Sequence, residues 1–320
     1  MDAPQIGYHL SSEEHSASDL VRYARRAEEA GFDFGVISDH FHPWVSQQGH
    51  SPFVWSVLGG IAHATERLKV GTGVTAPIIR VHPAIVAHAA ATVATMMPGR
   101  FFLGIGTGEN LNEHVVGQDW PTQRVRLEML MEAIDVLRDL WRGDTTSHRG
   151  TYFTVEGARI FDLPEQPPPI VVAASGGVTA GTVAEKADGL MSPIPDPEIS
   201  RSFQEAGGKG KPRYMKVTVC VGEDEAASRR FVRHQWPNEA VPGPLITELR
   251  LPEEFEAVAE LITEERVASD VVCSKDPEQH ISKIREAINA GFDHVWVHQV
   301  GPNQEQMFDL YEREILPALR

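Results

Sequence analysis

Two short stretches of this chain place acid–base side chains directly after an apolar run. The first stretch contains Asp39, His40 and Trp44, and the second contains Glu109. The imidazole of His40 can take up or return a proton near neutral pH. A partly buried carboxyl group at Glu109 can serve as the complementary acid or base. An acid and a base at two strand ends predict an enzyme whose proton transfers accompany another central event.

Each of these residues also has a purely structural explanation. His40 can be a strand-end histidine bonded to the backbone, Trp44 a packed lid residue, and Glu109 a solvated loop carboxylate. The His-x-His spacing of His40 and His42 also occurs in metal-dependent hydrolases on barrels. Such hydrolases need more ligands at other strand ends, and His298 is the one obvious candidate. We therefore expect no metal site and keep the hydrolase as an alternative.

Neighbouring features suggest a bound cofactor. Asp39 and His40 are adjacent in an extended segment and face opposite sides, so we expect Asp39 to receive a cofactor group and His40 to face the reactants. The three glycines within 104–108 lack the last glycine of the dinucleotide fingerprint, but they allow close approach of the backbone to a flat ring or phosphate. The small residues at 173–179 follow a strand and open a helix. These residues are the best candidate for a phosphate-binding site. The alternative is a tight strand-to-helix turn with no ligand.

The elements that must position these groups alternate between short apolar strands and amphipathic helices. Helix ends with a glycine cap precede strands at 30–33 and at 290–293. This alternation predicts βα units and a parallel sheet. We expect strands near 5–9, 34–38, 69–72, 101–105, 170–173, 189–192, 215–221 and 295–298. Eight strands favour a closed (β/α)8 TIM barrel, whose active sites lie at the strand C-terminal ends, over an open doubly wound sheet.

The domain organisation is predicted to be simple. We expect one domain over residues 1–320, because no low-complexity run or interdomain linker is visible. Residues 145–156 alternate in hairpin fashion and predict a small β excursion. Residues 222–275 are too long for one crossover helix and contain four prolines at 237–252. We interpret this region as a helical insertion over the barrel mouth.

Composition excludes several kinds of partner. The formal net charge of −16 and the sequence pI of about 5.3 argue against nucleic acid and anionic membranes, although local amides can still hold a small anion. Cys220 and Cys273 lie in apolar runs, which is typical of buried thiols in a reducing compartment. We find no signal-peptide pattern and no apolar stretch long enough to cross a bilayer. We therefore expect a cytoplasmic protein.

Several motifs together resemble one known family. They lie at 38–44, 49–53, 71–74, 102–113 and 140–144, and the likeness covers nearly the whole chain. Taken together they resemble the deazaflavin-dependent branch of the luciferase-like monooxygenase superfamily. The likeness is greatest to its glucose-6-phosphate dehydrogenase-like family, which uses coenzyme F420. The resemblance implies a bacterial luciferase-like TIM barrel, with the deazaflavin across the strand C-terminal ends, and usually a homodimer.

The resemblance also implies site residues and a reaction. The catalytic set would be His40, Trp44 and Glu109. The cofactor would be held by Asp39, Gly73, Val74, Ala76, Thr107, Gly108, Asn112, Ser175, Gly176, Val178 and Thr179. The bond between Gly73 and Val74 matches a non-proline cis peptide behind the ring. The implied reaction is hydride transfer between a hydroxyl-bearing carbon and C5 of the deazaflavin, with His40 at the substrate hydroxyl and Glu109 near the ring.

The chain departs from this family where its sugar-phosphate members bind phosphate. Those members use two lysines and an arginine, whereas here 192–198 is proline-rich and acidic. Around 242–251 and at 269–270 we find no clear lysine or arginine at the matching places, although Arg250 and Arg266 lie nearby. Ala76 also replaces a hydroxyl residue near the cofactor. We expect a neutral alcohol, a sugar or a carbonyl compound as substrate, and not glucose 6-phosphate. A monooxygenase using flavin mononucleotide (FMN) and a non-catalytic relative that binds the cofactor remain alternatives.

Overall fold

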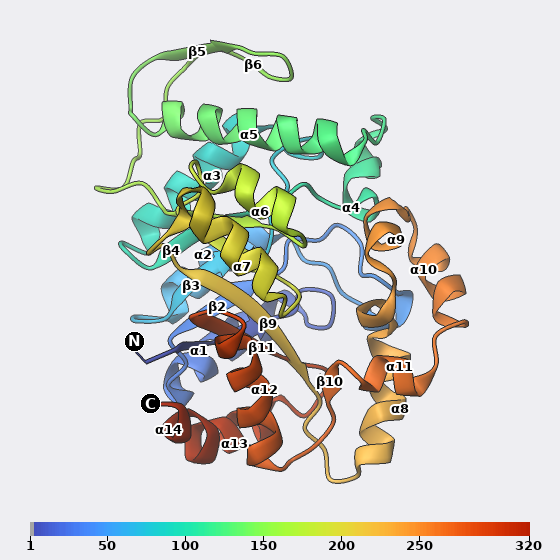
Figure 1. The fold of residues 1–320 in the computed structure, drawn as a ribbon. Coiled ribbons are helices and arrows are strands. Elements are labelled where there is room, and N and C mark those ends of the chain that lie inside the picture. Colours follow the sequence, from blue (N-terminus) through green and yellow to red (C-terminus); the bar gives the residue numbers. More distant parts are fainter. Residues whose placement is uncertain (1–2) are drawn as a thin grey trace.

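The computed structural model describes residues 3–320 and forms a closed parallel barrel (Figure 1). Within these residues eight strands pair in a ring, because β8 and β9 join the two ends of the sheet. In ring order they are β1 (Gln5–Leu10), β2 (Phe34–Ile37), β3 (Lys69–Thr72), β4 (Phe101–Ile105), β7 (Ile170–Ala173), β8 (Gly189–Ser192), β9 (Arg213–Val219) and β11 (His294–Gln299). The predicted (β/α)8 barrel is confirmed, and the open sheet is wrong.

One predicted strand is displaced along the chain. The apolar run suggested a strand at 215–221, whereas β9 ends at Val219. Beyond this residue the backbone leaves the barrel, and the amide of Cys220 donates to the carbonyl of Val272. Val272 lies in a two-residue strand, β10 (Val271–Val272), which pairs with the end of β9. Val219 therefore still pairs in the barrel, whereas Cys220 packs in the apolar cluster shared with the helices of 222–275, and Val221 belongs to the main core.

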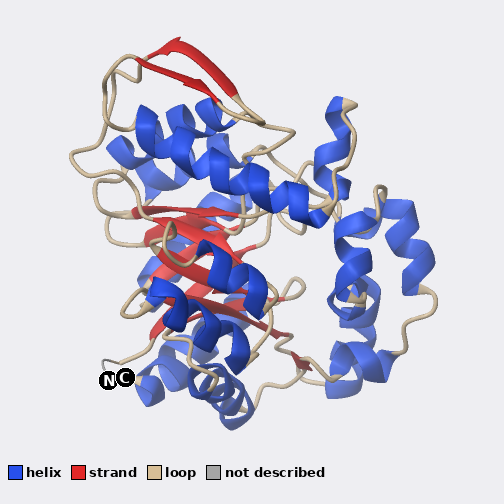
Figure 2. Ribbon diagram, turned by 45° about the horizontal axis from the view of Figure 1, so that its top comes forward, coloured by secondary structure: helices blue, strands red, loops and turns tan. Residues whose placement is uncertain are grey.

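Helices cover the outside of the barrel, as Figure 2 shows. The α-helices are α1 (Ala17–Ala30), α2 (Val54–Ala64), α3 (Pro83–Met96), α4 (Asn110–Glu113), α5 (Gln123–Leu140), α6 (Gly177–Val183), α7 (Pro197–Phe203), α12 (Pro277–Asn289), α13 (Gln304–Leu310) and α14 (Leu316–Leu319). Shorter or wider turns are η1 (Ser46–Gln48), η2 (His114–Val116), η3 (Gln204–Gly208) and η5 (Tyr311–Ile315). Helix α1 ends as its sequence suggests, at Gly31 in the left-handed conformation with φ of 87°.

Inward-facing aromatic and aliphatic side chains fill the lower part of the barrel. They are Phe34, Val36, Phe102, Val171, Met191, Tyr214 and Trp296. Glycines make room for them, since a Cβ atom on Gly71 would overlap the ring of Phe102. A Cβ atom on Gly104 would lie 1.8 Å from the carbonyl oxygen of Thr72, so the neighbouring backbone fixes that residue as glycine. This packed floor leaves the strand C-terminal ends as the place for polar groups.

Two segments extend beyond the barrel. The strands β5 (Thr146–Arg149) and β6 (Thr154–Ala158) form an antiparallel hairpin next to α5 (Figure 1). The second segment carries four α-helices and a 3-10 turn: α8 (Glu225–Gln235), η4 (Pro237–Ala240), α9 (Gly243–Glu248), α10 (Pro252–Ala259) and α11 (Glu264–Ala268). These helices stand together at the end where the strands finish (Figures 1 and 2). They share an apolar cluster with Trp44, so this segment, which we call the helical insert (222–275), packs on the barrel mouth.

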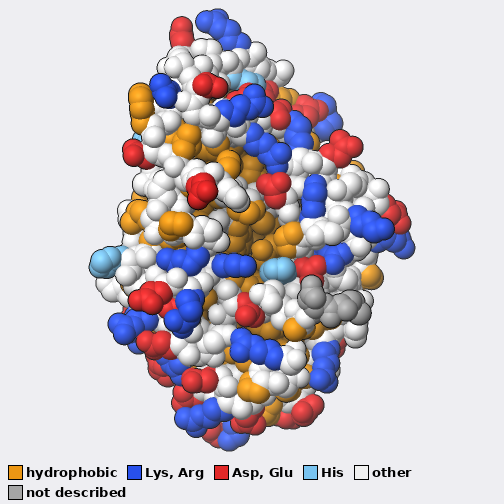
Figure 3. All heavy atoms as spheres, turned by 90° about the vertical axis from the view of Figure 1, so that its left-hand side faces the viewer, with side chains coloured by type: hydrophobic (Ala, Val, Ile, Leu, Met, Phe, Trp, Pro, Cys, Tyr) orange, Lys and Arg blue, Asp and Glu red, His pale blue; other side chains and the backbone are white. Residues whose placement is uncertain are grey.

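The side of the molecule that lies away from the helical insert carries the chain termini (Figure 1). Figure 3 shows the side on which the chain termini lie, with acidic and basic side chains interspersed and hydrophobic atoms visible between them.

Among residues 3–320, no helix is both long and apolar enough to cross a bilayer. The two cysteines are free and buried, and burial raises the pKa of Cys220 to about 11 and that of Cys273 to about 12.

Candidate active site

The loops that follow β2, β3 and β4 bring most of the predicted site residues to one end of the barrel. Because these strands are parallel neighbours, their C-terminal ends lie side by side. We call the three loops (39–44, 73–80 and 106–113) the front loops. Asp39 and His40 follow β2 and have different neighbours: Asp39 contacts Thr75 and Arg80, whereas His40 faces Glu13.

His40 is held by contacts on both ring nitrogens. Its Nδ1 lies 3.0 Å from the carbonyl oxygen of His42, and its Nε2 lies 3.4 Å from Oε1 of Glu13. The ring of Trp44 meets it edge-on with 4.8 Å between centroids. Both ring nitrogens of His40 therefore face oxygen atoms of the protein. Glu13 was missed by the sequence analysis because it follows β1, far from His40 in the chain.

Glu13 is a buried carboxylate in a polar setting. It accepts hydrogen bonds from Ser38 Oγ at 2.6 Å and from Ser11 Oγ at 3.2 Å. Burial works to raise its pKa, but the imidazoles of His40 and His9 and the hydrogen bond from Ser38 outweigh burial and lower it to about 2. Glu13 is thus ionised at neutral pH, and its carboxylate faces the His40 ring.

Asp39 makes contacts that the sequence did not reveal. Its Oδ1 lies 2.8 Å from Nη2 of Arg80, and its Oδ2 accepts a hydrogen bond from Thr75 Oγ1 at 2.7 Å. Arg80 also reaches the carboxylate of Glu113, with Nε 3.5 Å from Oε1 and its backbone amide 2.7 Å from Oε2. Burial raises the pKa of Glu113 to about 7, against the opposing effect of Arg80. Each oxygen of Asp39 thus has a protein partner, and its remaining lone pairs are the capacity left for a ligand.

Glu109 and Asn112 link the loops after β2 and β4. Half-buried Glu109 precedes α4 at the N-cap position, and its Oε2 lies 3.5 Å from the side-chain nitrogen of Asn112. The Asn112 oxygen accepts hydrogen bonds from the amides of Phe41, at 2.8 Å, and His42, at 3.3 Å. Asn112 is therefore a strut between the histidine loop and the glutamate loop.

The backbone around 73–76 and 104–108 forms a wall with few side chains. The Gly73–Val74 bond is cis, as the resemblance implies. A Cβ atom on Gly106 would lie 2.7 Å from the side chain of Val74, and one on Gly108, which has φ of +70°, would lie 2.9 Å from Ala76. Only glycine fits these positions without displacing the wall. A bare wall of this kind is suited to the flat face of a ring such as a deazaflavin.

The predicted phosphate turn lies after β7, the next strand in the barrel. Gly176 is extended at the N-cap of α6 and makes no side-chain cap hydrogen bond, while the Thr182 hydroxyl donates to the carbonyl of Val178. The side chain of Val178 is 86% exposed. Ser175 and Thr179 flank it on the same turn. The backbone amides here are open to a ligand, and the turn neighbours the Thr107 loop because β4 and β7 pair.

A second carboxylate–imidazole pair lies next to the first and was also missed. Oε2 of Glu14 lies 2.9 Å from Nε2 of His298, and both side chains are almost fully buried. Burial raises the pKa of Glu14 to about 7 and, with the charge of Lys216, lowers that of His298 to about 3. The ring of His9 packs edge-on against His298, at 4.6 Å between centroids. Consecutive glutamates thus contact two different imidazoles.

The helical insert contributes one carboxylate to this end of the barrel. Glu239 accepts hydrogen bonds from Lys216 at 2.9 Å, from Trp236 at 3.0 Å and from Thr218 at 3.2 Å. Burial opposes its charge, but Lys216 prevails and lowers its pKa. Within residues 3–320 no group of three or more His, Cys, Asp or Glu side chains is arranged to hold a metal ion.

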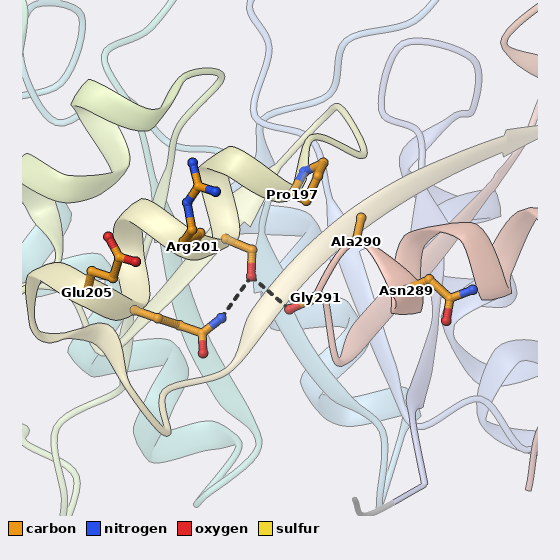
Figure 4. Close-up of a pocket in the computed structure, with 8 residues that line it drawn as sticks. Pro197, Arg201, Glu205, Asn289, Ala290 and Gly291 are labelled. Atoms are coloured by element: carbon orange, nitrogen blue, oxygen red, sulfur yellow. Dashed lines mark hydrogen bonds between the residues drawn. The ribbon is translucent and has the colours of Figure 1, made fainter.

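A separate surface hollow lies away from these residues. It has a volume of about 260 Å³ and lies between α7 and the end of α12, where Gln204 donates to Ser200 and Ser200 donates to the carbonyl of Gly291 (Figure 4). None of the predicted site residues lines it. The candidate site is therefore defined by the strand ends and not by this hollow.

A closed (β/α)8 barrel with acid–base groups at its strand C-terminal ends defines the class of TIM-barrel proteins that carry their active site there. Residues 1–294 match the family model described as luciferase-like monooxygenase, and the chain belongs to that family.

Curated relatives cover almost the full chain. The F420-dependent glucose-6-phosphate dehydrogenase of Microbacterium testaceum (strain StLB037) is 35% identical, over 99% of this chain and 97% of that protein. The protein of the same name from Kribbella flavida is 34% identical, over 99% of this chain and 98% of that protein.

Solved structures agree with the fold. An F420-dependent secondary alcohol dehydrogenase, solved in complex with an F420-acetone adduct, is 30% identical with a TM-score of 0.92 and covers 99% of both chains. A coenzyme F420-dependent tetrahydromethanopterin reductase from Methanopyrus kandleri has a TM-score of 0.80 at 21% identity, over 99% of this chain and all of that chain. This second likeness supports the barrel alone.

Proposed function

We propose that the protein is a coenzyme F420-dependent oxidoreductase that acts on CH–OH groups. The reaction is hydride transfer between a hydroxyl-bearing carbon and C5 of the deazaflavin. The observation that carries this proposal is the contact between His40, in the front loops, and Glu13, after β1, at the end of the barrel where the front loops form the bare backbone wall. Full-length relatives named as F420-dependent dehydrogenases support the same choice of cofactor over FMN.

The residues have the following proposed roles. His40 exchanges the proton of the substrate hydroxyl, Glu13 stabilises the protonated imidazole, and Trp44 shields the reacting carbon from water. Glu109 takes up or releases a proton near the deazaflavin ring. The deazaflavin, when bound, supplies the hydride acceptor or donor. Asp39, Gly73, Val74, Ala76, Thr107, Gly108, Asn112, Ser175, Gly176, Val178 and Thr179 are the residues that we propose to hold it.

We propose a neutral substrate and not glucose 6-phosphate. Arg80, Arg126 and Lys216 are largely buried cations at the strand C-terminal end, and each already pairs with a carboxylate. After β8, the segment 192–198 carries no lysine or arginine, and Asp196 caps α7 by accepting a hydrogen bond from the amide of Glu198. A phosphate dianion would have to compete for these paired cations, at a cost in affinity.

The remaining proposals concern organisation. We propose a single domain over residues 1–320, because the insert packs on the barrel through a shared apolar cluster. We also propose a homodimer, on the family resemblance, and a cytoplasmic location, which the two free buried thiols support. Light scattering of the purified protein tests the homodimer directly. A monomer at micromolar concentration would contradict it.

A bleaching assay tests the function. Purified protein with oxidised F420 is mixed in turn with simple secondary alcohols, sugars and sugar phosphates, and loss of the deazaflavin absorbance is followed. We expect bleaching with a neutral alcohol or sugar, and no competition from millimolar inorganic phosphate. The same panel with FMN is the control for the monooxygenase alternative. Absence of coenzyme binding by calorimetry would overturn the proposal, and clear competition by phosphate would restore the sugar-phosphate substrate.

A further inference from the structure

Arg80 lies where the three front loops meet. It stands between the cis peptide and the start of α3, and its side chain is 8% exposed. The carboxylates of Asp39 and Glu113, its two partners, are each 1% exposed. Neither the motifs nor the resemblance assigned a role to Arg80 or to Glu113.

The contacts of Arg80 run to both sides of the proposed reaction centre. On one side its Nη2 reaches Oδ1 of Asp39 at 2.8 Å and the Asp39 carbonyl oxygen at 3.3 Å. Asp39 is the residue directly before His40. On the other side its Nε and its amide approach the carboxylate of Glu113, at 3.5 Å and 2.7 Å. Glu113 is the last residue of α4, the one-turn helix that Glu109 caps.

We propose that Arg80 is a positioning residue, which sets the distance between the proton-exchanging groups His40 and Glu109 by joining the loops that carry them. This proposal rests on the proposed function. A planar guanidinium suits this role, because it presents several donors in fixed directions and can hold two carboxylates at once. A lysine has one flexible ammonium group and cannot reproduce both contacts in the same geometry.

The surrounding packing makes the link stiff. Asp39 is also fixed by Thr75 Oγ1 from the middle loop, at 2.7 Å. The Glu113 side chain passes close to Gly108, where a Cβ atom would lie 3.0 Å from its Cγ, so only glycine leaves it this space. Burial raises the pKa of Glu113 to about 7, while the hydrogen bond from the Arg80 amide and the charge of Arg80 act to lower it.

The test compares two arginines at opposite ends of the barrel. Arg80→Lys is made in parallel with Arg100→Lys. Arg100 bonds to the carbonyl oxygens of Thr65 and Leu68, where β3 begins, and lies outside the proposed site. The rate of F420 reduction in a single turnover, the dissociation constant for oxidised F420 and the crystal structure of the cofactor-free variant are measured for both.

The expected result separates positioning from binding. For Arg80→Lys we expect the single-turnover rate to fall by about 30- to 100-fold, since small displacements of reacting groups have effects of this size. The coenzyme dissociation constant should stay within about threefold, and the crystal structure should show loop 39–44 shifted relative to 106–113. Arg100→Lys should leave rate and affinity unchanged.

Other outcomes would overturn the inference. A folded Arg80→Lys with a rate within about twofold of wild type, or with equal losses of rate and coenzyme affinity, would do so. If Arg80→Lys does not fold, Glu113→Gln decides. It keeps an acceptor for the Arg80 amide and removes the charge, and an unchanged rate would then refute the role. Failure of wild type to bleach F420 would refute the proposed function instead, while the crystal structures would still test the link between the loops.

Discussion

The front loops and the helical insert hold the same end of the barrel in different ways. In the front loops the side chains of Asp39, Arg80 and Glu113 are almost fully buried, and Arg80 contacts both carboxylates. The insert is attached by separate carboxylates, one of which, Glu239, is largely buried. Another, Glu248, contacts Arg126 while its own side chain is 52% exposed.

This difference suggests a division of labour. Interlocked buried charges resist displacement, because breaking one contact leaves another charge unpaired. Such rigidity suits the side that must hold a flat coenzyme and two proton-exchanging groups in register. Separate and partly exposed contacts allow the insert to adjust, which suits the side that receives the substrate. On this division, chemistry and coenzyme binding should depend on the front loops, and substrate affinity should depend on the insert.

The largest effect is expected from removing the imidazole in the front loops. His40→Ala should reduce turnover by about two orders of magnitude or more, because a positioned acid–base group is lost. The dissociation constant for F420 should stay within about tenfold. Steady-state kinetics and fluorescence titration measure the two quantities. Equal losses of binding and rate would contradict a proton-transfer role.

The front loops and the insert should respond to pH in opposite directions. The pKa of Glu113 is raised to about 7, so its contribution to stability is full below its unfolded pKa and is lost as the pH rises through 7. The pKa of Glu239 is lowered, so its contribution is lost only as the pH falls into the acid range.

Urea unfolding at two pH values measures the contribution of Glu113 to the free energy of unfolding. The free energy of unfolding should lose about 2 kcal/mol from Glu113 between pH 5 and pH 8. Glu113→Gln should remove that share of the loss, whereas Glu239→Gln should leave it in place. Identical pH profiles for wild type and Glu113→Gln would show that the raised pKa is absent.

A smaller effect is expected from weakening the attachment of the insert. Glu239→Gln leaves Lys216 without its charged partner, although the amide can still accept a hydrogen bond. We expect the KM for the substrate to rise by about tenfold while coenzyme affinity stays unchanged. A matching loss of F420 affinity would show that the two regions do not act independently.

The smallest effect is expected at an exposed contact of the insert. Glu256 accepts a hydrogen bond from the amide of Ser46 at 2.8 Å, near the protein surface. Glu256→Gln should change the free energy of unfolding by less than about 0.5 kcal/mol and the kinetic constants by less than about twofold. It is therefore the matched control for Glu239→Gln, and a comparable rise in KM would remove the distinction between the two contacts.

Much of the fold followed from local sequence patterns. Short apolar runs between glycine-capped helices located the barrel strands, because such a strand is buried on both faces. The exception was β9, where the apolar run continues for two residues beyond the end of the strand: Cys220 is buried against the insert and Val221 in the main core. Periodicity reports burial and cannot say which neighbour does the burying.

The candidate site was predictable only in part. Asp39, His40 and Glu109 were recognisable because each directly follows a strand. Their partners Glu13 and Arg80 carry no local signal, because each contact joins loops from different strands. The predicted cofactor-facing Asp39 illustrates the limit, since the sequence could not reveal that both of its oxygens already have partners within the protein.

The manner in which the helical insert is fastened has a consequence for engineering. Residues 222–275 leave the barrel after β9 and return before α12, so both junctions lie on the same side of the scaffold. A segment with this topology can be exchanged as a cassette between relatives, provided that the receiving barrel keeps a cation matching Lys216. Such chimaeras would allow new substrate ranges to be screened while the barrel and its front loops, which we propose to hold the coenzyme, stay unchanged.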